Sequence, residues 1–286
     1  MKLVRFGDLG VERPGLLAAD GTLLDAGAIV GDYDGRFFDE GGLETLAQAV
    51  AASDPRLVPA PAGARIGAPI AVPQKIVCIG LNYADHAAEA GFPVPNEPMV
   101  FLKAPNTLIG PNDDVRIPRE GTRVDWEVEL AVVIGRQARY LADEHAALDA
   151  IAGFAVVNDL SERAFQLDRG GEWTKGKSCE TFNPLGPWLV TPDEVEDPQA
   201  LGMWLTVNGD EMQRSTTANM VWGAAHLVWY LSQFMVLDPG DLVNTGTPGG
   251  VGNLQQPPRF LAAGDVIELG LDGLGSQRVA VVGADA

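Results

Sequence analysis

Residues 124–135, VDWEVELAVVIG, are the stretch that decides the fold. Its second half is dense in β-branched and apolar residues and ends at Gly135, which predicts a strand buried on at least one face. Successive side chains of a strand point to opposite faces, so Asp125, Glu127 and Glu129 should share one of them. Several ionised carboxylates beside a core are costly unless a cation or bulk water stabilises them.

A hard divalent cation would satisfy such a row of carboxylates. Oxygen ligands suit Mg²⁺, Mn²⁺ or Ca²⁺, and the stretch has no neighbouring His or Cys that would favour zinc. A solvent-exposed strand edge would carry the same pattern. The sequence outside this stretch has to decide between a metal site and an exposed edge.

A third carboxylate follows a second apolar strand, IAGFAVVND, at residues 151–159. If this strand pairs with the first, Asp159 could complete a three-carboxylate oxygen site with Glu127 and Glu129. Asp159 could equally cap a helix predicted over 160–167, and the two roles are compatible. Two polar side chains of that helix, Arg163 and Gln166, would then project close to the carboxylates.

Composition limits the classes of partner. The chain has 286 residues, 46% of them hydrophobic, and a net charge of -19, which argues against nucleic acid or an anionic membrane. Its start lacks the apolar core of a signal peptide, and its longest apolar run, 220–237, is interrupted by polar residues, so we expect a cytoplasmic protein. Two cysteines without a C-x-x-C motif indicate neither a disulfide framework nor a zinc site.

Two units are expected along the chain. In residues 1–70, short strands near 3–6 and 15–17 and helical spacing over 43–50 predict a small N-terminal α+β unit. A stretch rich in Pro, Ala and Gly, 58–74, marks the boundary. Residues 71–286 form the second, β-rich unit, which contains the acidic strand.

The strongest candidate for a general base is His86. Residues 81–91 predict a short helix that Asn82 caps, and it places His86 and Glu89 three residues apart on one face. A carboxylate beside an imidazole orients it and favours its protonated form. A surface pair without function would look the same. The other two histidines fall in an exposed helix start and in an apolar helix predicted over 219–236.

Two loops carry further polar candidates. Residues 168–187 form a long polar loop with aromatic residues and two lysines, a composition that favours function. Residues 246–252, GTPGGVG, follow a strand but match neither a Walker A motif nor a dinucleotide fingerprint. Their backbone N–H groups and Thr247 would suit a carboxylate, although an ordinary turn would also fit.

Six stretches together resemble the fumarylacetoacetate hydrolase family over about residues 72–286: GLNYADH (80–86), FLK (101–103), DWEVE (125–129), ND (158–159), WTKGK (173–177) and GTPGGVG (246–252). The nearest branch resembles bacterial 2,4-diketo-3-deoxy-sugar-acid hydrolases of L-fuconate and L-rhamnonate breakdown. That similarity lies in WTKGKSCETFNPLGPW and GLGSQR. Relatives named as isomerases, decarboxylases or ureidoglycolate lyases share most of these motifs.

The resemblance implies an α+β, β-rich fold with a mixed β-roll catalytic domain, and a homodimer. It implies Mg²⁺ or Mn²⁺ on the residues that match Glu127, Glu129 and Asp159, and a mobile lid that carries His86 and Glu89. The founding hydrolase has a fourth carboxylate ligand near its lid, and in this sequence Asn82 and Asp85 lie near the corresponding position without a clear match to it. We therefore expect three protein ligands, with water or substrate in the remaining positions.

The implied reaction is metal-dependent cleavage of the C–C bond of a 2,4-diketo acid, which releases pyruvate and a second acid. His86 would be the base, Glu89 would orient it, and Lys177 would stabilise the oxyanion. The residues assigned to the substrate are Tyr83, Lys103, Arg163, Gln166 and Thr247. An oxaloacetate decarboxylase, a 2-hydroxyhepta-2,4-diene-1,7-dioate isomerase and a non-catalytic metal-dependent binder of small acids are the alternatives.

Overall fold

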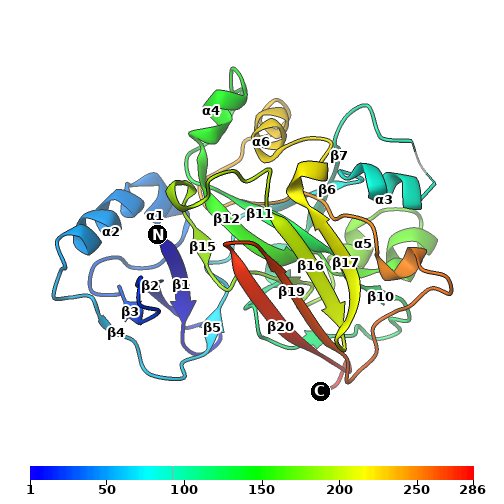
Figure 1. The fold of residues 1–286 in the computed structure, drawn as a ribbon, viewed down its shortest axis with the longest axis horizontal. Coiled ribbons are helices and arrows are strands. Elements are labelled where there is room, and N and C mark those ends of the chain that lie inside the picture. Colours follow the sequence, from blue (N-terminus) through cyan, green and yellow to red (C-terminus); the bar gives the residue numbers. More distant parts are fainter. Residues whose placement is uncertain (92) are drawn as a thin grey trace.

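The computed structural model describes residues 1–91 and 93–286 (Figure 1). The fold is α+β and rich in strands, as the sequence predicts. Its centre is an eleven-stranded mixed sheet with the order β4-β3-β2-β1-β15-β12-β11-β18-β6-β7, in which β5 also pairs with β1. This sheet carries the predicted acidic strand in its middle.

The N-terminal residues form one end of this sheet. Their elements are β1 (Lys2–Phe6), β2 (Arg13–Leu17), β3 (Leu23–Asp25), α1 (Gly35–Asp39), α2 (Gly42–Ala51), β4 (Val58–Pro59) and β5 (Ile66–Gly67). These bounds confirm the strands and the helix predicted in this unit. Because β1 also pairs with β15 (Leu189–Val190), backbone hydrogen bonds cross from residues 1–70 into the rest of the chain.

The central strands are β6 (Ile76–Gly80), β7 (Met99–Lys103), β11 (Val128–Ile134), β12 (Ile151–Asn158) and β18 (Leu242–Asn244). β11 pairs antiparallel with both β12 and β18, whereas β18 runs parallel to β6. Every residue of β11 and β12 is buried, because both faces of the sheet are covered. Even-numbered residues of β11, such as Leu130, pack in one core and odd-numbered ones, such as Ala131, in the other.

A second sheet covers one face of β11 and β12 and lies in front of them in Figure 1. Its strands, in order, are β17 (Asp210–Thr216), β16 (Gly202–Val207), β19 (Val266–Leu271), β20 (Gly275–Val282) and β9 (Val115–Arg116). Two short pairs complete the strands: β10 (Val124–Asp125) with β13 (Ser161–Glu162), and β8 (Leu108–Ile109) with β14 (Asn183–Pro184).

The remaining helices are short: α3 (Ala84–Glu89), α4 (Glu144–Leu148), α5 (Thr174–Lys177) and α6 (Ala224–Ser232). Single turns lie at Pro105–Thr107, Ala164–Asp168, Pro192–Glu194, Thr217–Asn219 and Gly252–Leu254. Among the helices of residues 1–91 and 93–286, none has the length and apolar character needed to cross a membrane.

Two predicted helices were wrong in extent or kind. The helix expected over 219–236 is limited to α6, which begins after Gly223, and Phe234 beyond it is 66% exposed. The helix expected over 160–167 is replaced by β13 and the turn Ala164–Asp168. Here pairing between β13 and β10 satisfies the backbone, so a tertiary contact overrides local propensity.

Candidate active site and metal centre

The acidic strand is interrupted where the site begins. Its predicted course over 124–134 breaks at Trp126 and Glu127, between β10 and β11. The N–H of Glu127 donates to Asn158 Oδ1 at 3.0 Å, and the N–H of Val128 donates to Gln213 Oε1 at 3.0 Å. Side chains therefore take the place of a neighbouring strand at this point.

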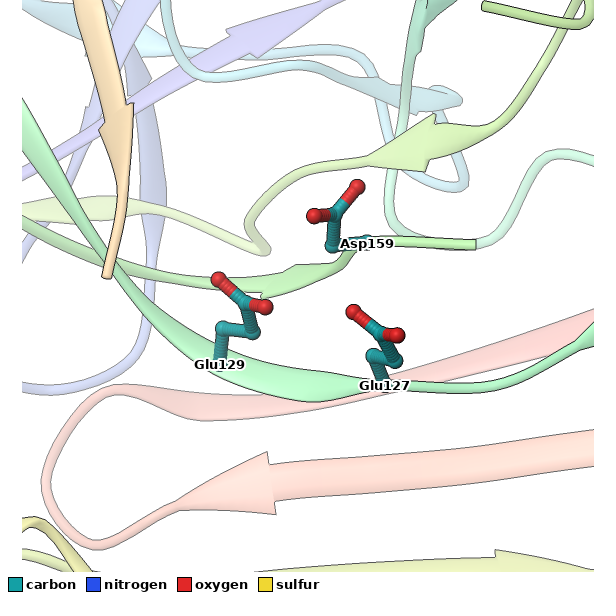
Figure 2. A group of neighbouring side chains, drawn as sticks. All are labelled: Glu127, Glu129 and Asp159. Atoms are coloured by element: carbon teal, nitrogen blue, oxygen red, sulfur yellow. The ribbon is translucent and has the colours of Figure 1, made fainter. Parts of the chain in front are cut away.

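Three of the predicted carboxylates come together. Each of Glu127, Glu129 and Asp159 is buried and offers an oxygen within 4.8 Å of those of the other two. In Figure 2 the two glutamates rise side by side at the start of β11, and Asp159 lies across from them. The antiparallel pairing of β11 with β12 brings Asp159 there, and its N–H donates to the Glu127 carbonyl at 2.9 Å.

Asp125 lies outside this cluster, contrary to the prediction that it shares its face with the glutamates. Its carboxylate accepts hydrogen bonds from the N–H groups of Gly252 at 2.7 Å and Asn253 at 3.0 Å. It also accepts one from Arg163 Nε at 2.8 Å. The strand break is the physical reason, because alternation does not continue across Trp126.

The charges around the cluster fit a divalent cation. The three clustered carboxylates and Asp125 are buried together with three cations that contact them, Lys103, Arg163 and Lys177. The carboxylates outnumber the cations, and a bound metal ion would neutralise the excess negative charge. An oxygen-only ligand set suits a hard ion.

One oxygen of the Asp159 carboxylate also fits a bound metal ion. Asp159 Oδ2 is buried and accepts no hydrogen bond from the described residues. Lys177 Nζ lies 3.0 Å from this oxygen but is not aligned to donate to it. A buried carboxylate oxygen without an acceptor role is costly, and coordination to a metal would satisfy it.

The two glutamates differ in their electrostatic surroundings. Burial alone would raise the pKa of Glu127, but Lys177 at 2.6 Å and Arg163 at 2.7 Å outweigh it and lower that pKa to about 2. Burial and the charges of Asp159 and Glu127 raise the pKa of Glu129 well above its usual value. A hydrogen bond from the Gly246 N–H at 2.8 Å offsets this only in part. A cation among the three carboxylates would therefore stabilise the charged form of Glu129 most.

The two lysines of the site have different surroundings. Lys103 is buried and its ammonium group binds the Asp159 carboxylate and the carbonyls of Leu160 at 3.2 Å and Phe182 at 2.6 Å. All three of its N–H donors are used, so Lys103 holds the Asp159 carboxylate in place. Lys177 lines the cavity, and although burial disfavours its charge, the carboxylates of Asp159 and Glu127 raise its pKa to about 12.

A cavity of about 120 Å³ adjoins the cluster. Glu127 lines this cavity, whereas Glu129 and Asp159 are not among its lining residues. The fully buried Tyr83, assigned to the substrate from the sequence, has its hydroxyl 3.2 Å from Met203 Sδ in the core and does not reach the cavity. The polar side chains on the wall are those of His86, Glu127, Arg163, Gln166, Lys177, Thr247 and Asn253.

His86 reaches the cavity from α3, but its expected partner is not hydrogen-bonded to it. Its Nδ1 lies 3.7 Å from Glu89 Oε2, which instead accepts the Gly250 N–H at 2.9 Å. The pKa of Glu89 is lowered, first by His86 and then by this N–H, against the effect of burial. Glu89 therefore remains charged beside the imidazole.

The cap predicted for α3 was wrong. Tyr83 occupies the N-cap position, and the buried Asn82 donates through Nδ2 to the carbonyls of Thr245 at 2.7 Å and Trp222 at 3.0 Å. These bonds use the amide of Asn82, and Asp85 is not among the clustered carboxylates. Within the described residues, neither side chain supplies a fourth ligand.

The comparisons with known proteins agree with this geometry. Residues 75–282 match the fumarylacetoacetate (FAA) hydrolase C-terminal family. The chain belongs to the fumarylacetoacetate hydrolase family. A Burkholderia lata protein, provisionally named a hydrolase, is 50% identical over 279 residues, which are 97% of each chain.

Solved structures of the fumarylacetoacetate hydrolase family share the fold along the whole chain. A Mycobacterium smegmatis protein provisionally named HpcE has a TM-score of 0.89 and 35% identity, with 100% of both chains covered. Maleylpyruvate hydrolase of Sphingobium sp. SYK-6, in complex with manganese(II) and pyruvate, has a TM-score of 0.82 and 32% identity, with 99% of each chain covered. A 2-hydroxyhepta-2,4-diene-1,7-dioate isomerase of Mycobacterium marinum has a TM-score of 0.74 and 30% identity, with 100% of each covered. The family therefore includes both hydrolases and isomerases.

The glycine-rich loop binds carboxylates, but they belong to the protein. The N–H groups of Gly246, Gly250 and Gly252 donate to the carboxylates of Glu129, Glu89 and Asp125, respectively, at 2.7 to 2.9 Å. The hydroxyl of Thr247 donates to the Val128 carbonyl at 3.0 Å. The loop thus holds the ligand strand and α3 together.

Sequence reasoning missed Gln213, which lies on β17 and is buried. Besides accepting from Val128, it donates through Nε2 to Thr247 Oγ1 at 2.8 Å and to the Pro248 carbonyl at 3.0 Å. It therefore ties the interrupted ligand strand to the glycine-rich loop. No local signal marks it, because the need for it arises from the strand break.

Arg163 and Gln166 lie where the sequence predicts them, beside the carboxylates, but they arrive from β13 and the following turn. Arg163 contacts Asp125 and Glu127, and its Nη1 donates to Gln166 Oε1 at 3.0 Å. Although burial opposes its charge, these two carboxylates raise the pKa of Arg163 further. The guanidinium is fixed at the cavity wall.

Proposed function

We propose that this member of the fumarylacetoacetate hydrolase family is a metal-dependent hydrolase. Its reaction would cleave the C–C bond of an acylpyruvate-type 2,4-diketo acid and release pyruvate and a second acid. The observation that carries this proposal is a buried three-carboxylate cluster beside a cavity that also holds His86 and Lys177. The manganese and pyruvate complex of the maleylpyruvate hydrolase supports it.

Glu127, Glu129 and Asp159 would hold the ion, for which we propose Mg²⁺ or Mn²⁺. When bound, such an ion supplies Lewis-acid stabilisation to the oxygens of a keto acid. Lys103 would keep Asp159 in place through its ammonium group. Arg163 and Gln166 would bind the polar end of the substrate from the cavity wall, whereas the Thr247 hydroxyl already donates to the Val128 carbonyl.

His86 would act as the general base. Neutral imidazole would take a proton from the water that attacks C4, and the charged Glu89 nearby would stabilise the resulting imidazolium. The ammonium of Lys177 would stabilise the oxyanion that forms on C4. The C3–C4 bond then breaks, and the imidazolium returns its proton to C3 of the leaving pyruvate enolate.

An isomerase is the second candidate, because the Mycobacterium marinum isomerase shares the fold over the whole chain. It would use the same polar wall to move a proton without consuming water. The finer prediction of a 2,4-diketo-3-deoxy sugar acid as substrate, and that of a homodimer, rest on the sequence resemblance.

Product analysis of purified protein, stripped with a chelator and reloaded with Mg²⁺ or Mn²⁺, tests the proposal. We expect pyruvate and acetate from acetylpyruvate only when metal is present. Rearrangement of 2-hydroxyhepta-2,4-diene-1,7-dioate without pyruvate release would establish the isomerase instead. Turnover of oxaloacetate alone would establish a decarboxylase, and a ligand-induced rise in Tm without any product would establish a binder.

A further inference from the structure

The cavity has an apolar wall that the proposed chemistry does not use. We call apolar wall the six side chains of Leu81, Phe101, Leu167, Trp173, Val251 and Leu254, which line the cavity together with the polar groups. A substrate whose keto-acid end lies at the carboxylate cluster would need to place its remaining atoms against other parts of this lining. The apolar wall therefore bears on the chemistry of the acyl end.

Two aromatic rings build the core of this wall. The centroids of Phe101 and Trp173 lie 5.3 Å apart in an edge-on arrangement. The indole packs directly on the backbone of β6, since a Cβ atom at Gly80 would lie 2.7 Å from its ring. The aromatic surface begins next to the reacting groups, because Lys177 Nζ lies 5.3 Å from the Phe101 centroid.

The basic side chains of the lining are already paired with a carboxylate of the protein. Among the described lining residues, the lysines and arginines are Arg163 and Lys177, and both contact Glu127. A second carboxylate on the substrate would therefore lose water against the apolar wall without gaining an ion pair, which is unfavourable. Apart from the polar lining residues already assigned to the keto-acid end and to catalysis, the described lining offers a polyhydroxylated chain the side chain of Asn253, too few polar groups for several hydroxyls.

We propose that the apolar wall receives the acyl group of the substrate and selects acylpyruvates with a short alkyl or aryl group. Acyl groups that carry a second carboxylate or several hydroxyls are disfavoured. This inference rests on the proposed hydrolase function and narrows its substrate class. It departs from the sugar-acid substrate that the sequence resemblance implies.

A substrate series on the Mn²⁺-loaded protein tests the inference. We expect kcat/KM to rise about fourfold per methylene from acetylpyruvate to butanoylpyruvate, the usual gain for a buried methylene. Fumarylpyruvate and a 2,4-diketo-3-deoxy sugar acid should be at least about tenfold poorer than butanoylpyruvate. A flat series, or a faster reaction with either polar substrate, would overturn the inference. Absence of pyruvate from every substrate would instead overturn the hydrolase function.

Two variants locate the effect on the wall. Trp173→Ala should lower kcat/KM for butanoylpyruvate more than for acetylpyruvate, so the ratio between them falls toward one. Leu254→Arg should raise kcat/KM for fumarylpyruvate relative to butanoylpyruvate, because it supplies a cation at the apolar end. Phe234→Ala, which removes an exposed aromatic ring that follows α6 and does not line the cavity, should leave both ratios unchanged. Unchanged ratios in both wall variants would contradict the assignment.

Discussion

The carboxylate cluster and the α3 segment line the same cavity but are held in different ways. The cluster lies at the ends of two fully buried central strands, and Lys103, Lys177, Arg163 and the Gly246 N–H contact its carboxylates. By contrast, α3 has six residues, of which one is buried, and no side-chain hydrogen bond caps its start. Glu89 ties it to the glycine-rich loop through one hydrogen bond.

We call the carboxylate cluster the binding half of the site; α3, with His86, carries the proposed base. Many buried contacts hold the binding half, so its geometry should persist through the reaction. The half that carries the proposed base is held by few contacts, so its displacement should cost the least free energy in this region. Variants in the two halves should therefore differ in kind: one set should change metal binding and the other should change turnover alone.

The largest effect is expected from Glu127→Ala, which removes a ligand from the binding half. It also leaves Lys177 and Arg163 buried with one partner fewer, a change that typically destabilises a protein by about 3 to 5 kcal/mol. We expect no measurable Mn²⁺ binding by titration calorimetry and no turnover. Glu127→Gln keeps the volume and separates loss of the ligand from misfolding, and the exposed Glu180→Ala is the control. Unchanged Mn²⁺ affinity would refute the ligand assignment.

His86→Ala tests the other half. We expect kcat to fall about a hundredfold or more, as for a positioned general base, while Mn²⁺ affinity is retained. Single-turnover kinetics and calorimetry on the same preparation measure the two effects. His145→Ala, in the exposed part of α4, provides the matched control. Normal turnover in His86→Ala would remove this residue from the mechanism.

Gln213→Leu should give a smaller effect, on the binding half alone. It leaves the buried Val128 N–H without its partner, which should cost about 1 to 3 kcal/mol of unfolding free energy. Because Gln213 positions the strand between two ligands, we expect Mn²⁺ affinity to fall about tenfold. Chemical denaturation and calorimetry measure both, with the exposed Gln48→Leu as control. A loss of stability without a loss of affinity would limit Gln213 to a structural role.

The contrast between the carboxylate cluster and α3 also explains which parts of the structure could be predicted from the sequence. β11 and β12 were predicted because their apolar composition is a local signal, and the spacing of Glu127 and Glu129 on one face follows from alternation. Their meeting with Asp159 followed once the two strands were assumed to pair. The binding half is therefore largely encoded in short stretches.

What the sequence could not predict depends on distant contacts. The break after Asp125 is stabilised by Asn158 and Gln213, which come from other strands. The glycine-rich loop was expected to bind a substrate carboxylate, and nothing local indicates that Glu129, Glu89 and Asp125 occupy its N–H groups. The apolar wall likewise forms only when β6, β7 and the 168–187 loop meet.

The smallest effect is expected from Glu89→Gln, which changes the hydrogen bond that attaches α3 to the glycine-rich loop. The amide oxygen can still accept the Gly250 N–H, but a charge-assisted bond becomes a neutral one. We expect amide exchange across 84–89 to become a few times faster, because neutral hydrogen bonds are weaker. Hydrogen exchange followed by mass spectrometry measures this, with Glu97→Gln as the control outside the segment.

The lowered pKa of Glu89 gives this prediction a pH dependence. A carboxylate whose folded pKa is depressed stabilises the folded state fully above its unfolded pKa, which is about 4.3 for glutamate, and loses this effect as pH falls through the folded value. The protection of α3 in the wild-type chain should therefore stay constant from neutral pH down to about 4.3 and fall below it. In Glu89→Gln the same pH change should leave the protection unaltered. If both chains lose protection together, the attachment of α3 does not depend on the charge of Glu89.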